Sequence, residues 1–177
     1  MRMSLQFPIA VVLSIVPLAV PAWADYKAGE DAYNRSDYAT ALHEWQPLAE
    51  QGDSSAQVKL GTLYVNGQGV SEDYQQALYW FRLAAKHGNA MAQTKLGLMY
   101  ERGNGVTKDF ILAHKWYILG AANGDKLGAE FRDALAKRMT PAQIFKAQQL
   151  ALEGKPKDSG SQKANERRPP QTRNHVR

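Results

Sequence analysis

Apolar residues recur at helical spacing along residues 53–124, interrupted by short glycine-rich loops. In the first half of residues 53–88 they fall every three or four positions, as one face of a helix requires: Ala56, Leu60, Gly61 and Tyr64. A Gly-x-Gly-Val loop follows, and Asp73 then stands where its side chain can cap a second helix. The apolar or small positions of that second helix are Ala77, Trp80, Phe81, Ala84 and Ala85. The pattern therefore predicts a helix–turn–helix hairpin.

The same 36-residue pattern is written twice, in residues 53–88 and 89–124. Fifteen positions are identical at this offset, and they include the apolar stripe, the loop glycines and a tryptophan. Repetition at this period predicts a stacked array of helical hairpins, because a single hairpin of this size cannot bury enough surface alone. We expect Trp80 and Trp116 to fill the space between neighbouring hairpins and to be largely buried.

Capping residues mark where each unit begins. Asp53, Asn89 and Asp125 recur every 36 residues, each directly after a glycine, and each can accept a backbone N–H at the start of a helix. Thr140 and Gln143 have the spacing of a capping box, with a proline at the first helical position between them.

The residues on either side of the two full repeats extend the array. Residues 25–52 hold the same register with a shorter turn, since Gly29 and Ala41 are 12 residues apart whereas Gly61 and Ala77 are 16 apart. After residue 124 the pattern weakens, as terminal repeats do. The sequence therefore predicts one all-helical domain over residues 25–153, with hairpins at 25–52, 53–88 and 89–124 and a C-terminal cap at 125–153.

These residues resemble the Sel-one-like repeat (SLR), a longer-looped relative of the tetratricopeptide repeat. The shared pattern is A-x-x-x-L-G-x-x-Y-x-x-G-x-G-V-x-x-D-x-x-x-A-x-x-W-x-x-x-A-A-x-x-G, which residues 56–88 follow throughout. The resemblance implies an all-α, right-handed α-solenoid of helix–turn–helix repeats. It also implies an adaptor or scaffold, of the kind often found in bacterial envelopes or secretory pathways.

Residues 1–24 have the form of an export signal. A positive residue, Arg2, precedes an apolar run, and Ala22-Trp23-Ala24 has the small–any–small form that a signal peptidase accepts. The alternative is an uncleaved membrane helix, which needs about 20 apolar residues. Three prolines and three polar residues interrupt this segment: Pro8, Pro17, Pro21, Ser4, Gln6 and Ser14. We therefore predict cleavage after Ala24, a periplasmic or secreted protein, and no integral membrane segment after cleavage.

Residues 154–177 differ in composition from the predicted domain. They hold 7 Lys and Arg against 2 Asp and Glu, whereas residues 25–153 hold 14 against 15. With so few apolar residues this tail cannot bury enough surface to order itself, so we expect it to be disordered. A basic tail could contact an anionic envelope polymer or lipid headgroups. Export argues against nucleic acid, and we favour the simpler interpretation, which is an extension that aids solubility.

The sequence offers little catalytic chemistry. It contains no cysteine, hence no disulfide and no thiolate nucleophile. The histidines show no pair at metal-ligand spacing: His43, His87, His114 and His175. The paired loop glycines suit a hairpin turn and lack the remainder of a phosphate-binding motif. We predict a non-enzyme without cofactor or metal. A β-lactam hydrolase is the alternative that the resemblance suggests, although the cysteines of those relatives and a nucleophile–base pair are both missing.

One face of the predicted first helices is a candidate binding surface. A helical wheel places it opposite the packing stripe, and in tetratricopeptide-like arrays this side lines a concave groove. The resemblance therefore implies partner contacts from Lys59, Thr62, Lys95, Leu98 and Arg102, together with Glu30 and Tyr33 from the first unit. Val58, Met91 and Leu98 are apolar on this face, and its cations could bind an acidic side chain or a C-terminal carboxylate of a protein or peptide partner. An ordinary solvated face with scattered apolar residues would show the same pattern.

The sequence thus predicts an exported, non-catalytic protein–protein interaction module that binds a partner segment in its concave groove. A second possibility, of a different class, is an envelope structural factor associated with peptidoglycan or polysaccharide machinery through its tail.

Overall fold

The computed structural model describes residues 24–153 of the 177-residue chain. This part consists of eight α-helices: α1 (Tyr26–Asn34), α2 (Tyr38–Glu50), α3 (Ser54–Asn66), α4 (Tyr74–Lys86), α5 (Ala90–Arg102), α6 (Phe110–Ala122), α7 (Lys126–Ala136) and α8 (Pro141–Glu153). No strand occurs within it. The predicted export signal, apart from its last residue, and the predicted tail lie outside the described residues.

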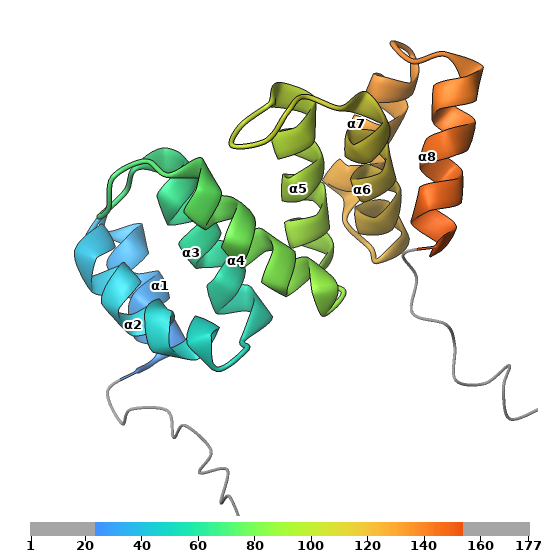
Figure 1. The fold of residues 1–177 in the computed structure, drawn as a ribbon. Helices are drawn as coiled ribbons and strands as arrows, with labels where there is room; N and C mark the ends of the chain where they lie inside the picture. Colours follow the sequence, from blue (N-terminus) through green and yellow to red (C-terminus); the bar gives the residue numbers. More distant parts are fainter. Residues whose placement is uncertain (1–23, 154–177) are drawn as a thin grey trace, which may run out of the picture.

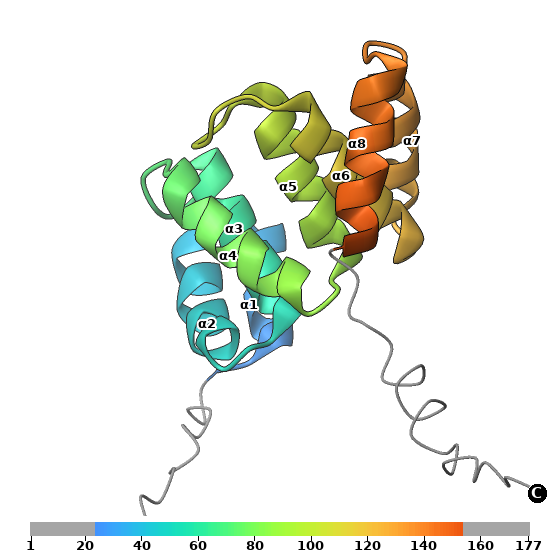
Figure 2. The same ribbon diagram turned by 45° about the vertical axis from the view of Figure 1, so that its right-hand side comes forward.

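The helices pack in chain order into a series of hairpins. The first hairpin is α1 with α2, the second α3 with α4, and the third α5 with α6, and each hairpin contacts the next through α2·α3 and α4·α5. The last two helices both pack on α6. Figures 1 and 2 show this progression from α1 and α2 at one end to α7 and α8 at the other. The predicted all-α solenoid of helical repeats is confirmed.

The predicted helix starts are also confirmed, because the side chains cap the backbone as expected. Asp53 and Asn89 accept hydrogen bonds from the backbone N–H groups of Ala56 and Ala92, at 2.8 and 3.0 Å. Asp125 caps α7 in the same way. Before α8, the Thr140 N–H donates to Gln143 Oε1 at 2.9 Å and the Gln143 N–H donates to Thr140 Oγ1 at 3.3 Å, which is a reciprocal capping box.

Each hairpin closes where a glycine of its first helix meets an aromatic ring of its second. A Cβ added at Gly61 would lie 2.5 Å from the Phe81 ring, so a larger residue would hold the two helices apart. Gly29 faces Trp45 and Gly97 faces Tyr117 in the same arrangement. These three rings are completely buried, so they are the central packing residues of the three hairpins.

The loop glycines make a second close approach, between successive hairpins. Gly69 has a φ of 72°, and a Cβ added to it would lie 2.8 Å from the backbone of Tyr38, the first residue of α2. Gly105 has a φ of 68° and approaches Tyr74, the first residue of α4, equally closely. The Gln75 side chain also donates to the Gly105 carbonyl at 2.6 Å. The loop of each full repeat is therefore fastened to the hairpin before it.

The two repeat tryptophans differ in burial. Trp80 is 8% exposed and packs in the cluster that contains Trp45 and Leu60, as predicted. Trp116 is partly buried and packs at the edge of the neighbouring cluster, so it is less deeply buried than Trp80. Lys115 Nζ lies 5.0 Å from the centroid of the Trp116 ring. A lysine therefore lies over part of this ring, while the adjacent Tyr117 occupies the core position that Phe81 holds in the earlier repeat.

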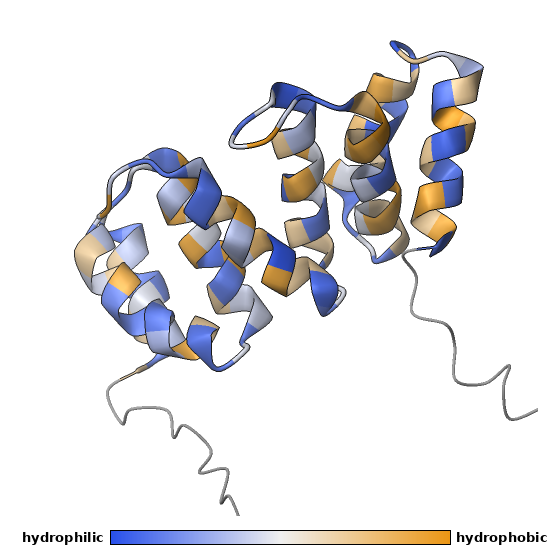
Figure 3. Cartoon of the chain, in the orientation of Figure 1, coloured by the Kyte–Doolittle hydropathy of each residue, from blue (hydrophilic) through white to orange (hydrophobic). Residues whose placement is uncertain are grey.

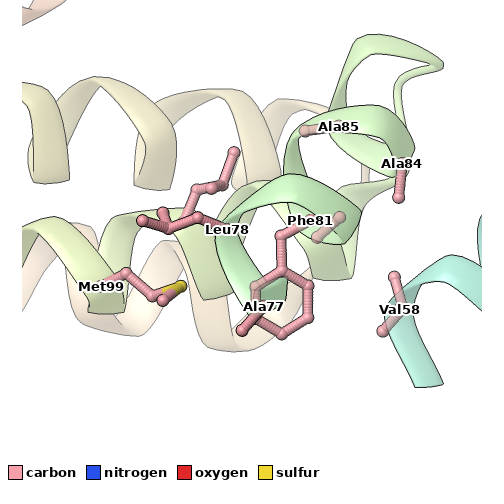
Figure 4. Packing of buried hydrophobic residues seen from close by; sticks show 9 residues of the cluster. Val58, Ala77, Leu78, Phe81, Ala84, Ala85 and Met99 are labelled. Atoms are coloured by element: carbon pink, nitrogen blue, oxygen red, sulfur yellow. The ribbon is translucent and has the colours of Figure 1, made fainter. Parts of the chain in front are cut away.

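The buried cluster around Phe81 joins the second and third hairpins. Its members come from α3, α4 and α5, among them Val58, Leu78 and Met99. Figure 4 shows Ala77 and Phe81 on one helix close to one another, with Met99 reaching toward them from the next. In Figure 3 most helices alternate between hydrophobic and hydrophilic residues, whereas α6 is hydrophobic over much of its surface. Helix α6 contacts α5, α7 and α8, which explains that difference.

Candidate partner-binding groove

The first helices of the second and third hairpins line a cavity of about 200 Å³. Its walls come from α3, α4, α5 and the loop that follows α5. They consist of Thr62, Val65, Asn66, Phe81, Lys95, Leu98, Met99, Arg102 and Asn104. Four of the five residues that the sequence singled out therefore lie around one cavity: Thr62, Lys95, Leu98 and Arg102.

A second cavity, of about 550 Å³, lies next to the first. Leu98 and Arg102 line both, so the two cavities are neighbours on either side of these side chains. The second cavity is completed by Glu101, Lys108, Phe131, Ala134, Leu135 and Arg138. We call the two cavities together the α5 groove, because α5 contributes side chains to both.

Lys59, the fifth predicted residue, lies elsewhere. Its Nζ is 3.4 Å from Glu30 Oε1, and it sits 5.6 Å from the ring centroid of Tyr33 and 5.3 Å from that of Trp45. These partners belong to the first hairpin, so Lys59 links α3 to that hairpin. It does not line the α5 groove.

Positive charge predominates in the α5 groove. Four cationic side chains line it, Lys95, Arg102, Lys108 and Arg138, against the single carboxylate of Glu101. Burial lowers the pKa of Lys95, and the negative charge of Asp125 partly offsets this effect. Within the part of the chain that the structure describes, neither Lys95 nor Arg102 forms an ion pair. The ammonium group of Lys95 and the guanidinium group of Arg102 are therefore available to an acidic ligand.

Glu101, in contrast, is already engaged. Tyr117 donates its hydroxyl to Glu101 Oε2 at 2.8 Å, and Arg138 donates to Oε1 at 2.6 Å. Burial raises the pKa of the Tyr117 hydroxyl, and the hydrogen bond to Glu101 raises it further, so Tyr117 remains a donor. This network neutralises the one acidic group in the groove.

Several residues that line the groove were not predicted from the sequence. For two of them, the repeat pattern of the sequence contained enough information to predict them. Phe131 and Arg138 stand 36 residues after Lys95 and Arg102, so extending the repeat register beyond residue 124 would have found them. Asn104 and Lys108 lie in the loop between α5 and α6, where helical periodicity gives no information. Val58, expected on the open face, is only 5% exposed, because it packs in the cluster around Phe81.

Residues 24–153 show neither a metal site nor a membrane-spanning helix. No group of three or more His, Asp or Glu side chains is arranged to hold a metal ion there. No helix in this range combines the length and hydropathy needed to cross a membrane.

The fold and the groove together define a helical-repeat protein with a cationic, partly apolar binding surface. The Sel1 repeat pattern matches residues 54–89 and 90–125, and we conclude that the chain belongs to the Sel1 repeat (SLR) family. Proteins built from such repeats generally act as protein–protein interaction modules.

Two solved structures illustrate the relationship. A Sel1 repeat protein from Oxalobacter formigenes is 32% identical, with a TM-score of 0.55, over 62% of this chain and 85% of that one. The protein c5321, described as a protective antigen present in uropathogenic Escherichia coli strains and displaying an SLR fold, is 26% identical with a TM-score of 0.71. That match covers 86% of this chain but 34% of c5321, so this chain spans about a third of its length. No curated protein matches the chain.

Proposed function

We propose that this protein is an exported, non-catalytic interaction module that holds a segment of a partner protein in the α5 groove. The observation that carries the proposal is the gathering of Lys95, Leu98 and Arg102 around adjoining cavities, with neither cation in an ion pair among the described residues. Membership of the Sel1 repeat family supports an interaction role in general. Export rests on the form of residues 1–24, and contact of the basic tail with an anionic envelope polymer rests on its composition.

The chemistry of the groove suits a peptide segment. Exposed apolar area and unpaired cations on one concave surface give both hydrophobic and electrostatic contributions to binding. Leu98 and Phe131 are only partly buried and remain at the groove surface. Lys95 is partly withdrawn from water, so an acidic partner would interact with it more strongly than with a fully solvated lysine.

Capture from an envelope fraction tests the proposal. The mature protein carrying Lys95→Glu and Arg102→Glu should lose its captured partner, while its helical content stays unchanged because neither residue belongs to the buried core. The matched control is the double charge reversal Lys86→Glu and Lys146→Glu, at exposed positions away from the groove. Equal capture by both double variants would refute binding in the groove.

A third arm removes residues 154–177. Loss of capture in this truncated protein alone, with the groove variants binding normally, would instead favour an envelope structural factor that acts through its basic tail. Detection of the unprocessed N-terminus on the native protein by mass spectrometry, in place of one beginning at Asp25, would refute export by cleavage.

A further inference from the structure

Lys59 and Lys95 occupy the same position in successive repeats but have different surroundings. Near Lys59, helix α1 supplies the carboxylate of Glu30 and the ring of Tyr33. Counted from the buried glycine of each helix, the corresponding residues of α3 are Thr62 and Val65, which are uncharged. Both line the cavity together with Lys95. Lys59 thus forms an ion pair with Glu30, whereas Lys95 forms none within residues 24–153 and is influenced only by the more distant charge of Asp125.

The spacing of the α5 side chains that line the groove determines how far apart complementary groups on a ligand must be. Lys95, Leu98 and Arg102 follow an i, i+3, i+7 pattern and therefore share one side of the helix. With a rise of about 1.5 Å per residue, the two cations stand roughly 10 Å apart along the helix axis. An extended peptide rises about 3.3 Å per residue and points alternate side chains to opposite faces. Its side chains at i, i+2 and i+4 therefore share one face and span about 13 Å, which the long Lys and Arg side chains can meet. Leu98 lies between the cations and offers an apolar contact.

The remaining groove residues add to this pattern without opposing it. Glu101 would repel an acidic ligand if it were free, but it is held by Tyr117 and Arg138. Phe131, whose ring centroid is 5.6 Å from that of Tyr117, adds apolar surface beside Leu98.

We propose that the α5 groove recognises an extended peptide segment with two acidic side chains four residues apart and an apolar side chain midway between them, all three on the same face of the peptide. The acidic groups bind Lys95 and Arg102, and the apolar side chain packs on Leu98 and Phe131. This inference rests on the proposed role of the groove and specifies the chemistry of its partner.

A defined peptide tests it. The probe is acetyl-Gly-Glu-Ser-Leu-Ser-Glu-Gly-amide, whose blocked ends carry no charge, and binding to the mature protein is followed by NMR titration. Matched peptides replace both Glu by Gln, or Leu by Ser. The Glu peptide should bind at least about tenfold more tightly than the Gln peptide, since charge-assisted contacts exceed neutral ones by this order. The Ser peptide should also bind more weakly, in a way that added salt does not reproduce.

The protein variants compare the two lysines directly. Lys95→Met and Arg102→Met should each weaken binding of the Glu peptide about tenfold. Lys59→Met is the matched control, because it removes the same group at the same repeat position but outside the groove. It should change the affinity less than about twofold. Equal weakening by Lys59→Met and Lys95→Met would overturn the proposal, as would equal binding of the Glu and Gln peptides.

Two further outcomes separate this inference from the proposed function. If groove charge reversal abolishes capture from the envelope fraction but the Glu peptide does not bind, the peptide chemistry is wrong and the groove function stands. If only a peptide with a free C-terminal carboxylate binds, a terminal carboxylate replaces the internal acidic pair. If neither capture nor peptide binding depends on the groove, both proposals fail.

Discussion

The repeats at 53–88 and 89–124 have helices of the same length, capped at equivalent positions, yet their cores differ in polarity. Three apolar residues of the earlier repeat, Val58, Leu78 and Phe81, are replaced at the 36-residue offset by Thr94, His114 and Tyr117. All six side chains are buried. The repeat backbone is therefore specified by its small residues, caps and ring positions, while the polarity of the remaining core positions can vary.

Polar groups are tolerated in the later repeat where they find partners. Thr94 donates its hydroxyl to the Ala90 carbonyl at 3.2 Å, and Tyr117 donates to Glu101. His114 differs, because its Nδ1 is buried without a hydrogen-bond partner among the described residues. Thr94 and Tyr117 thus keep their hydrogen bonds on burial, whereas His114 gives up the solvation of one ring nitrogen.

The tryptophan pair provides the largest test of this comparison. Trp80→Ala should destabilise the protein by about 3–5 kcal/mol, the range for removal of a buried aromatic ring. Trp116→Ala should cost less, since its side chain is more exposed than that of Trp80 and hydrophobic stabilisation scales with buried area. Chemical denaturation of both variants measures the difference. Equal losses would show that Trp116 is as deeply packed as its counterpart.

His114 gives a test that depends on pH. Burial lowers its pKa below 6.5, and the positive charge of Arg132 lowers it further, against a smaller opposing effect of Asp133. Because the unfolded chain then binds the proton more readily, stability should fall as the pH drops below about 6.5. His114→Leu, which restores the residue type of Leu78, should remove this part of the pH dependence. It should also stabilise the protein at neutral pH by about 1–3 kcal/mol, the usual cost of an unsatisfied buried polar group.

Thermal unfolding between pH 7.5 and 5 measures this effect. The reverse exchange, Leu78→His, is the matched control and should add a pH dependence of the same sign. Parallel curves for the parent protein and His114→Leu would show that His114 does not titrate in this range.

Tyr117→Phe should have the smallest effect, a loss of about 1 kcal/mol. The ring that fills the space against Gly97 is retained, but Glu101 loses one of its two donors. Phe81 shows that a phenyl ring suits this repeat position. A change as large as that of Trp80→Ala would mean that the Glu101 network contributes far more than a single hydrogen bond.

The comparison also shows how far the sequence determines the structure. The hairpins, the caps at Asp53 and Asn89, and the capping box at Thr140 follow from local patterns and could be predicted from them. The shallower burial of Trp116 could not, because positions 80 and 81 are also adjacent aromatic residues and both are buried, so the repeat pattern carries no signal for the difference.

The candidate groove shows the same limit. Helical periodicity and the resemblance located Thr62, Lys95, Leu98 and Arg102 on one surface, and these residues do line adjoining cavities. Neither signal could separate Lys59 from Lys95, which are the same residue at the same repeat position. The distinction comes from Glu30 and Tyr33, which belong to a helix joined by a shorter loop and reach Lys59 only in the folded structure.

The contacts of Gly69 and Gly105 with the preceding hairpins have a mechanical consequence. Neighbouring hairpins are joined at two places, by their packed helices and by a loop backbone that rests on the start of an earlier helix. Any bending that widens the spacing between hairpins must break both the helix packing and the loop contact at the same time. The solenoid should therefore resist deformations that separate its hairpins. The width of the groove should accordingly be the same before and after a partner binds.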